Sequence, residues 1–119
     1  DLVLSEANLL ARLRPSGHVY LVTFEFVQER VDDEWRALND RVQEAAESNP
    51  AYAGRDVWHR GDRTLVAYRW ETAEGLQRFR EHPVHREAKA RYEEWYGGFE
   101  VTIAEVLTEY GDGGLDGEE

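Results

Sequence analysis

The chain has 119 residues, of which 41% are hydrophobic and 12% aromatic, so it can bury one core and is not a disordered protein. Its formal net charge of −11 opposes binding to nucleic acid or to an anionic membrane, and no apolar run approaches the roughly 18 residues of a membrane span. Cysteine is absent, which excludes disulfides and thiol chemistry. With no secretory leader visible in DLVLSEANLL, we expect a cytoplasmic protein.

The first 17 residues precede the expected domain. The segment 2–13, LVLSEANLLARL, has the spacing of a short amphipathic helix with Ser5 as a candidate N-cap. A poorly ordered arm is an equal alternative, because chain ends are often untethered. We therefore treat 1–17 as an N-terminal helical arm, separate from the domain.

The stretch 18–28, HVYLVTFEFVQ, is the clearest strand. Tyr20, Val22, Phe24 and Phe26 alternate onto one face, and the other face is also apolar at its start. Strands that are apolar on both faces are usually covered on both. A domain of this size has few elements to do so, which favours a second subunit over one face.

A helix and a hairpin follow. Asp32 is placed to cap a helix over 33–48, which Asn49 and Pro50 end. Two strands, 55–60 and 64–71, flank the dipeptide Gly61-Asp62. Glycine at the first turn position predicts a type II′ hairpin.

The segment from Trp70 to Tyr96 is predicted to be helical and broken once. Thr72 can cap a short helix over 73–81, and Pro83 begins a second helix over 84–96. Gly97-Gly98 is expected to end that helix in a left-handed conformation. The alternating stretch 99–107, FEVTIAEVL, is the last strand.

This β-α-β-β-α(α)-β order predicts an α+β, ferredoxin-like split βαβ fold. It implies a four-stranded antiparallel sheet with helices on one face. The domain is expected to span 18–110, followed by a flexible acidic tail over 111–119. We expect the open sheet face to form a homodimer.

The core from 18 to 107 resembles the antibiotic biosynthesis monooxygenase (ABM) family of the dimeric α/β-barrel superfamily. The resemblance is carried by VYLVTFEF, by VAYRWETAEGLQRF, by HPVHREA and by EEWYGGFEVTIAEV. It implies a dimeric α/β barrel. It also implies a range of activities, from quinone-forming oxygenases that need no metal or flavin to haem-degrading enzymes and proteins without assigned activity.

The haem-degrading branch is disfavoured, because its Asn-Trp-His triad is not matched. Aligned on Trp70, the chain has Arg78 where that branch has the tryptophan and Ala88 where it has the histidine. The first strand contains no asparagine. We expect no cofactor.

His82 and His85 are the candidate catalytic residues. A histidine near neutral pKa can accept a proton from a phenol. The pair is a weak metal site, because Pro83 lies between the two and no third ligand is evident, so we expect no metal. The alternative is that His82 only caps a helix and that His85 lies on the surface.

Aromatic residues form the candidate substrate-binding site. Trp58, Tyr68 and Trp70 could make one wall of a cavity between sheet and helices, with Arg69 beside them. Opposite them, the second wall would use Trp35, Tyr92 and Trp95. Flat polycyclic ligands suit such walls. The alternative is that these are ordinary core aromatics.

Two charges interrupt the apolar strands, Glu25 and Arg69. They could pair inside the cavity or lie at the sheet edge, and the second is favoured. The sequence therefore supports a cofactor-independent, monooxygenase-like protein acting on a small aromatic or polycyclic substrate. The alternative is a non-catalytic ligand-binding or stress-associated protein of the same fold.

Overall fold

The protein is described by a computed structural model that covers residues 19–115. The predicted N-terminal helix and the last four residues of the predicted tail lie outside that range. The elements, in chain order, are β1 (Tyr20–Gln28), α2 (Asp33–Glu47), β2 (Tyr52–Arg60), β3 (Arg63–Trp70), α3 (Ala73–Glu81), α4 (Pro83–Ala90), the 3-10 turn η1 (Tyr92–Glu94) and β4 (Tyr96–Glu105). None of the helices within 19–115 is long and apolar enough to cross a membrane.

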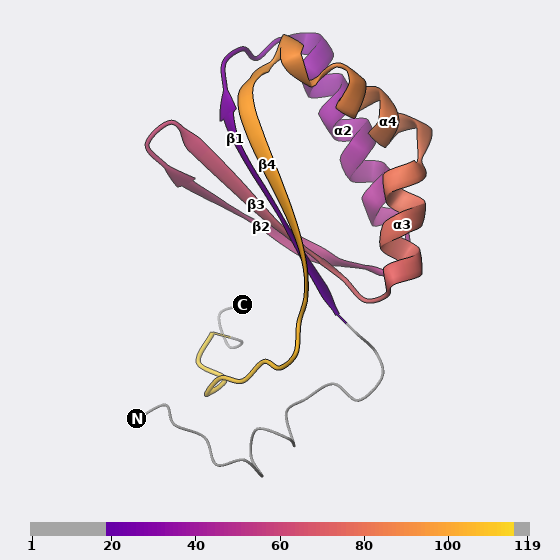
Figure 1. Cartoon of the computed structure of the whole chain (residues 1–119), viewed down its shortest axis with the longest axis vertical. Coiled ribbons are helices and arrows are strands. Elements are labelled where there is room, and N and C mark those ends of the chain that lie inside the picture. The colour runs from indigo at the N-terminus through magenta and orange to yellow at the C-terminus, as the bar shows by residue number, and fades with distance from the viewer. Residues whose placement is uncertain (1–18, 116–119) are drawn as a thin grey trace.

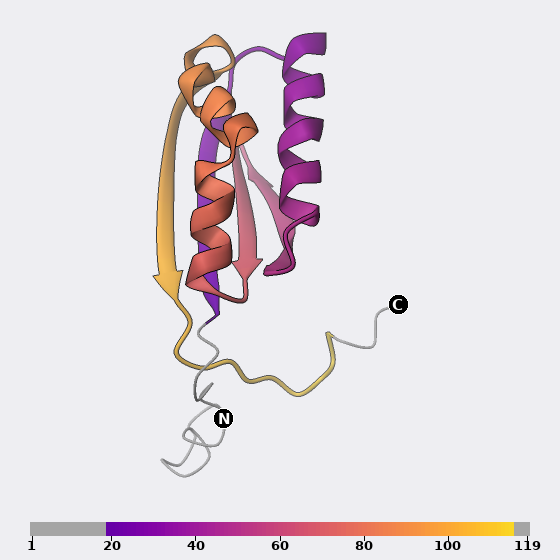
Figure 2. The same cartoon turned by 90° about the vertical axis from the view of Figure 1, so that its right-hand side faces the viewer.

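The four strands form one antiparallel sheet in the order β2-β3-β1-β4. The helices lie on one face of it (Figures 1 and 2). This confirms the predicted ferredoxin-like α+β fold. The predicted first strand, the helix after Asp32 and the helix 73–81 are confirmed to within two residues.

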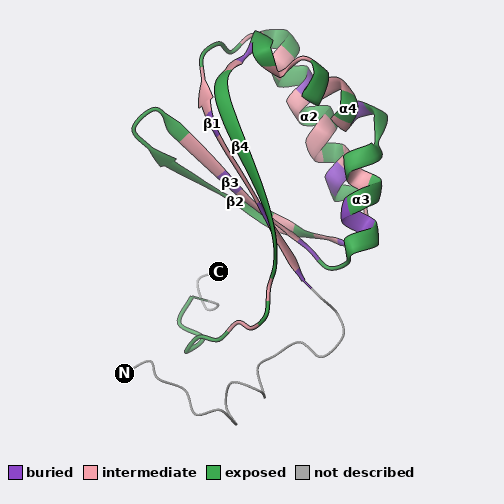
Figure 3. Ribbon diagram, in the orientation of Figure 1, coloured by how far each residue is buried: buried purple, intermediate pink, exposed green. Residues whose placement is uncertain are grey.

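The core lies between the sheet and the helices and consists of two clusters. One joins Val22 and Trp70 of the sheet to Leu76 of α3. The other joins Leu38 of α2, Val84 of α4 and Trp95. Trp70 and Trp95 are each only 1% exposed, so each anchors a cluster. Figure 3 shows the buried positions on the inner sides of the helices, while β4 is exposed along its length.

Asp32 holds several elements together. Its carboxylate accepts hydrogen bonds from the Trp35 backbone amide at 2.8 Å and from Trp95 Nε1 at 3.0 Å. Arg30 donates to the other oxygen at 2.9 Å. The N-cap of α2 predicted from the sequence is therefore confirmed, and the same carboxylate also ties α2 to the chain entering β4. We call this arrangement the Asp32 junction.

The β2–β3 hairpin turns as predicted. Gly61 has a φ of 60°, whereas Asp62 keeps a negative φ, which fits type II′ and not type I′. The turn pairs Arg60 with Arg63 and hence Trp58 with Leu65. A bulge between Tyr52 and Arg55 then shifts the register by one residue. Gly54, at a φ of 113°, supplies the backbone conformation this bulge needs.

The second predicted helix of the broken segment is shorter than expected. It ends at Ala90 instead of residue 96, and the 3-10 turn η1 follows. The cause is tertiary pairing: the Trp95 carbonyl accepts from the Glu29 and Arg30 amides at 2.8 and 3.2 Å, which draws the chain into the sheet early. α4 is thereby separated from β4 by one tight turn.

Gly97-Gly98 is not the left-handed helix stop that was predicted. Both glycines lie inside β4, and neither has a positive φ. A Cβ atom at Gly97 would lie 2.5 Å from Glu29 Oε2, so this position is limited by the close approach of a side chain. The prediction was wrong because pairing with β1, through Tyr96 and Gly98, draws this stretch into the sheet.

Replacing Asp32 with alanine should lower the thermal midpoint, because α2 loses its cap and Trp95 loses its partner. The hydrogen bond from the Trp35 backbone amide is the main reason why the pKa of Asp32 lies below its ordinary value of 3.8. A lowered pKa stabilises the fold at pH values above 3.8, and this stabilisation is lost as the pH falls through the folded-state value. Calorimetry from pH 7 to pH 2 should therefore show the gap between wild type and Asp32→Ala closing in acid.

Asp33→Ala is the matched control. Asp33 is the first residue of α2, but it is fully exposed and its ion pair with Arg36 at 3.0 Å contributes little. An equal decrease of the thermal midpoint in the two variants would contradict the stabilising role of the Asp32 junction.

Candidate functional site

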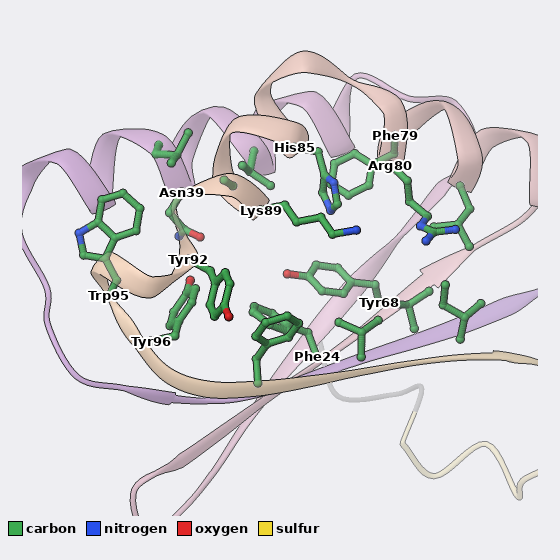
Figure 4. Close-up of a pocket in the computed structure, with 18 of the residues that line it drawn as sticks. Phe24, Asn39, Tyr68, Phe79, Arg80, His85, Lys89, Tyr92, Trp95 and Tyr96 are labelled. Carbon is green, nitrogen blue, oxygen red and sulfur yellow. The ribbon is translucent and has the colours of Figure 1, made fainter.

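A pocket of about 280 Å³ lies between the sheet and the helices (Figure 4). The sheet provides its floor and the helices its roof, and both core clusters contribute to it. Its lining is mostly apolar and aromatic, as is usual for a site that binds a small organic molecule. The residues are Val22, Phe24, Trp35, Leu38, Asn39, Val42, Tyr68, Trp70, Leu76, Phe79, Arg80, His85, Ala88, Lys89, Tyr92, Trp95, Tyr96, Phe99, Val101 and Ile103.

His85 points from α4 into this pocket (Figure 4). Pro83 is the first residue of α4, and the chain changes direction there after α3. His85 lies on the first turn of α4 and faces the sheet. The imidazole packs edge-on against Phe79 of α3, with ring centroids 4.9 Å apart. Its Nδ1 is buried and has no hydrogen-bond partner in the described part of the chain. Because this nitrogen is shielded from solvent, a ligand in the pocket would meet the exposed edge of the imidazole.

Burial also lowers the pKa of His85 below its ordinary value of 6.5. Desolvation is the main cause, and the charges of Lys89 and Arg80 act in the same direction. The nearby backbone carbonyl of Arg80 opposes them. At neutral pH the imidazole is therefore uncharged and can accept a proton.

Two tyrosine hydroxyls give the pocket polar points on its sheet side. Burial raises the pKa of Tyr68 to about 12, so this phenol stays protonated at physiological pH. Burial also raises the pKa of Tyr96, whose oxygen accepts a hydrogen bond from Trp35 Nε1 at 3.0 Å. Tyr68 is thus a neutral group facing His85 across the pocket (Figure 4), whereas Tyr96 is held in the wall.

Five of the aromatic residues proposed from the sequence line the pocket together. Tyr68 and Trp70 belong to the floor, and Trp35, Tyr92 and Trp95 belong to the end near the Asp32 junction. Trp70 and Trp95 are almost fully buried, so they shape the wall as core residues and offer a ligand little surface.

Trp58 and Arg69 do not belong with them. Trp58 is 66% exposed, and because it pairs with Leu65 it lies on the sheet face opposite Tyr68. Arg69 neighbours Tyr68 in sequence, so strand alternation also places it on that opposite face, where it pairs with Glu109. The predicted wall of Trp58, Tyr68 and Trp70, and the placing of Arg69 beside it, were wrong.

Glu25 lies on the same open face and pairs with Arg63 at 2.9 Å. The alternative in which Glu25 and Arg69 pair inside the cavity is therefore wrong as well.

His82 lies outside the pocket lining. Its Nδ1 accepts a hydrogen bond from the Val84 amide at 3.1 Å, so it caps α4, while the residue itself is exposed. This placement matches the capping alternative for His82. His85 is half-buried and faces the cavity, contrary to the surface alternative. Among residues 19–115, no group of three or more His, Asp or Glu side chains could hold a metal ion.

Several lining residues were missed from the sequence. Phe24 was assigned to the correct strand face but not to the site. Lys89 follows His85 by one helical turn, and that spacing was a usable signal. Arg80 and Asn39 had no comparable signal, because their place depends on how α3 and α2 lie over the sheet.

No family model and no curated protein matches this sequence. Solved structures do match its fold. Rv0793 from Mycobacterium tuberculosis is 18% identical with a TM-score of 0.65, over 78% of this chain and 99% of that one. SnoaB, a cofactor-independent oxygenase from Streptomyces nogalater, is 9% identical with a TM-score of 0.65, over 80% and 99%.

A candidate antibiotic biosynthesis monooxygenase from Chloroflexus aurantiacus is 16% identical with a TM-score of 0.54, over 78% of this chain and 97% of its own. The resemblance to the ABM family drawn from the sequence is thus confirmed as structural similarity across most of the chain. At these identities the similarity establishes the fold, and the reaction has to be argued from the site.

NMR titration of the histidines should give His85 a pKa below 6.5, because its ring is desolvated by the pocket and by Phe79. Phe79→Ala should raise that pKa toward 6.5 as water reaches the ring. Phe99→Ala is the matched control, since Phe99 lines the pocket but its ring contacts are with Phe24 and Tyr92. A His85 pKa at or above 6.5 in the wild type would contradict the described burial.

Proposed function

We propose that this protein is an oxygenase that acts on a flat aromatic substrate without a metal or flavin, using His85 as the base. The observation that carries the proposal is the half-buried imidazole of His85, which lines an apolar pocket of about 280 Å³ opposite the Tyr68 hydroxyl. The fold of a cofactor-independent oxygenase, SnoaB, supports the reaction class. Haem degradation stays disfavoured.

The proposed chemistry begins with proton transfer. A ring-bound CH₂ next to a phenol or ketone loses a proton to His85, which leaves a delocalised anion. That anion is electron-rich enough to react with O₂ directly. The carbon becomes a carbonyl, one oxygen atom enters the product and the other leaves as water, so the four electrons lost by carbon are those gained by O₂.

The chain contributes position and environment to this reaction. The aromatic walls hold the rings flat, and the neutral Tyr68 hydroxyl can donate a hydrogen bond to the substrate oxygen on which negative charge develops. The apolar lining keeps water away from the anion. Tyr68 and Tyr92 remain substrate-binding candidates, Trp70 and Trp95 shape the wall behind them, and Trp58, Arg69 and His82 leave the proposed site.

A non-catalytic ligand-binding protein is the alternative, favoured by the near-complete burial of Trp70 and Trp95 in the pocket wall. It would bind the same class of compound but would not consume O₂.

We also propose that the open sheet face pairs with a second copy of the chain. Trp58 on β2 is 66% exposed on that face, and Leu21 and Leu65 lie on the same side of the sheet. An exposed tryptophan beside apolar strand positions favours a protein interface.

Anthrone is a suitable first substrate, because it is flat and has an acidic CH₂ between two rings. His85→Gln should lower kcat/KM for O₂ consumption by about 10² to 10⁴, the usual contribution of a general base. In the wild type, kcat/KM should rise with pH through a midpoint below 6.5, since the neutral imidazole is the active form.

His82→Asn is the matched control, because asparagine can still accept from the Val84 amide and keep the helix cap. Full activity in His85→Gln would overturn the assignment of the base. Tight binding of anthrone without O₂ consumption by the wild type would favour the non-catalytic alternative.

Sedimentation velocity at micromolar concentration should show a dimer, and Trp58→Glu should shift it toward monomer, because a carboxylate would be buried in the interface. Val57→Glu is the control: Val57 is also exposed, at 46%, but lies on the other face of the same strand. A wild-type monomer would contradict the proposed pairing.

A further inference from the structure

We call the part of the pocket lined by Arg80 and Lys89 its mouth, and both of these charged side chains are cations. The chain has 25 acidic residues, yet none lines the pocket, whereas Arg80 and Lys89 do, beside the uncharged imidazole of His85. Lys89 is the only lysine in the sequence. Figure 4 shows the Lys89 ammonium extending into the space between His85 and Tyr68 and the Arg80 guanidinium beside that space. A positive site in a protein of net charge −11 needs a specific explanation.

Neither cation has an acidic partner among the described residues. Elsewhere, Arg41 pairs with Glu87 at 3.1 Å and Arg63 pairs with Glu25 at 2.9 Å. Within residues 19–115, no carboxylate forms an ion pair with Lys89 or Arg80. Arg80 has a hydrogen bond to the Gln77 amide oxygen, a long one at 3.3 Å.

We propose that the pocket selects flat aromatic compounds that carry a carboxylate, with the carboxylate bound by Lys89 and Arg80. This rests on the pocket of the proposed function but not on its oxygenase step. The rings lie between Phe24 and the helices, and the acid group lies at the mouth, where the guanidinium offers a bidentate partner.

The geometry explains why both cations are needed. Arg80 comes from α3 and Lys89 from α4, so they approach the mouth from two helices that meet at the His82-Pro83 break. A carboxylate between them would satisfy both charges and leave the ring beneath His85. A neutral ring of the same size would leave both cations solvated and would gain nothing from them.

The test compares 2-naphthoate with 2-naphthamide, which have the same rings and differ in charge. Titration calorimetry on the full chain, at low and high salt, gives both affinities. We expect the carboxylate to bind about tenfold more tightly than the amide at low salt, as for a charge-assisted hydrogen bond. Added salt should reduce this ratio.

The double variant Arg80→Gln, Lys89→Gln should abolish the preference while retaining amide binding. Arg86→Gln is the control, since Arg86 lies on α4 but outside the pocket lining and carries the same charge. Equal binding of the two compounds by the wild type would overturn this inference and leave the pocket intact. Failure of both to bind would overturn it together with the pocket. Binding of 2-naphthoate by a protein that fails to oxidise anthrone would sustain it while the oxygenase proposal falls.

Discussion

The Asp32 junction is the constraint on which the shape of the pocket depends. One carboxylate oxygen accepts from both the Trp35 amide and Trp95 Nε1, so it fixes the start of α2 against the chain that leads into β4. The Trp95 carbonyl in turn accepts from two amides that follow β1, and Trp35 Nε1 donates to the Tyr96 hydroxyl. Two segments distant in sequence, 29–35 and 95–96, are therefore joined by several hydrogen bonds. Because Tyr92, Trp95 and Tyr96 all lie in or beside this junction, it builds one end of the pocket.

The other end is built by aromatic packing. Tyr52 contacts Trp70 at 5.2 Å between ring centroids, Trp70 contacts Phe79 at 5.0 Å, and Phe79 contacts His85 at 4.9 Å. This row runs from the sheet core through α3 to the imidazole on α4, so apolar contacts help to set the orientation of His85. The side along β4 is different, since Phe99, Val101 and Ile103 are each more than 40% exposed and leave the pocket open there.

The sequence predicted the fold well because local signals and tertiary packing agree in most elements. Asp32 and Thr72 are strong caps, and Gly61-Asp62 sets its turn without help from the rest of the chain. The errors arose where long-range pairing decided the outcome. Gly97 lies in a strand because β1 pairs there, and Trp58 lies on the open face because the hairpin register places it opposite Leu65. The register of the hairpin could have been predicted from its two-residue turn. The position of Arg80 at the pocket mouth could not, because it depends on the angle at which α3 packs on the sheet.

The cations at the mouth affect the base and the ligand in opposite ways. In the empty pocket, Lys89 and Arg80 help lower the His85 pKa, which makes the imidazole a weaker base. A bound carboxylate would neutralise much of that charge, so the pKa of His85 should rise when such a ligand occupies the mouth. The imidazole would then accept a proton more readily from an acidic position on the same ligand, and the anion left behind would lie close to the newly formed imidazolium. A neutral ligand would not have this effect. In the proposed reaction, charge selection by Lys89 and Arg80 would therefore be coupled to proton transfer at His85, and this coupling would favour reaction only after the correct ligand has bound.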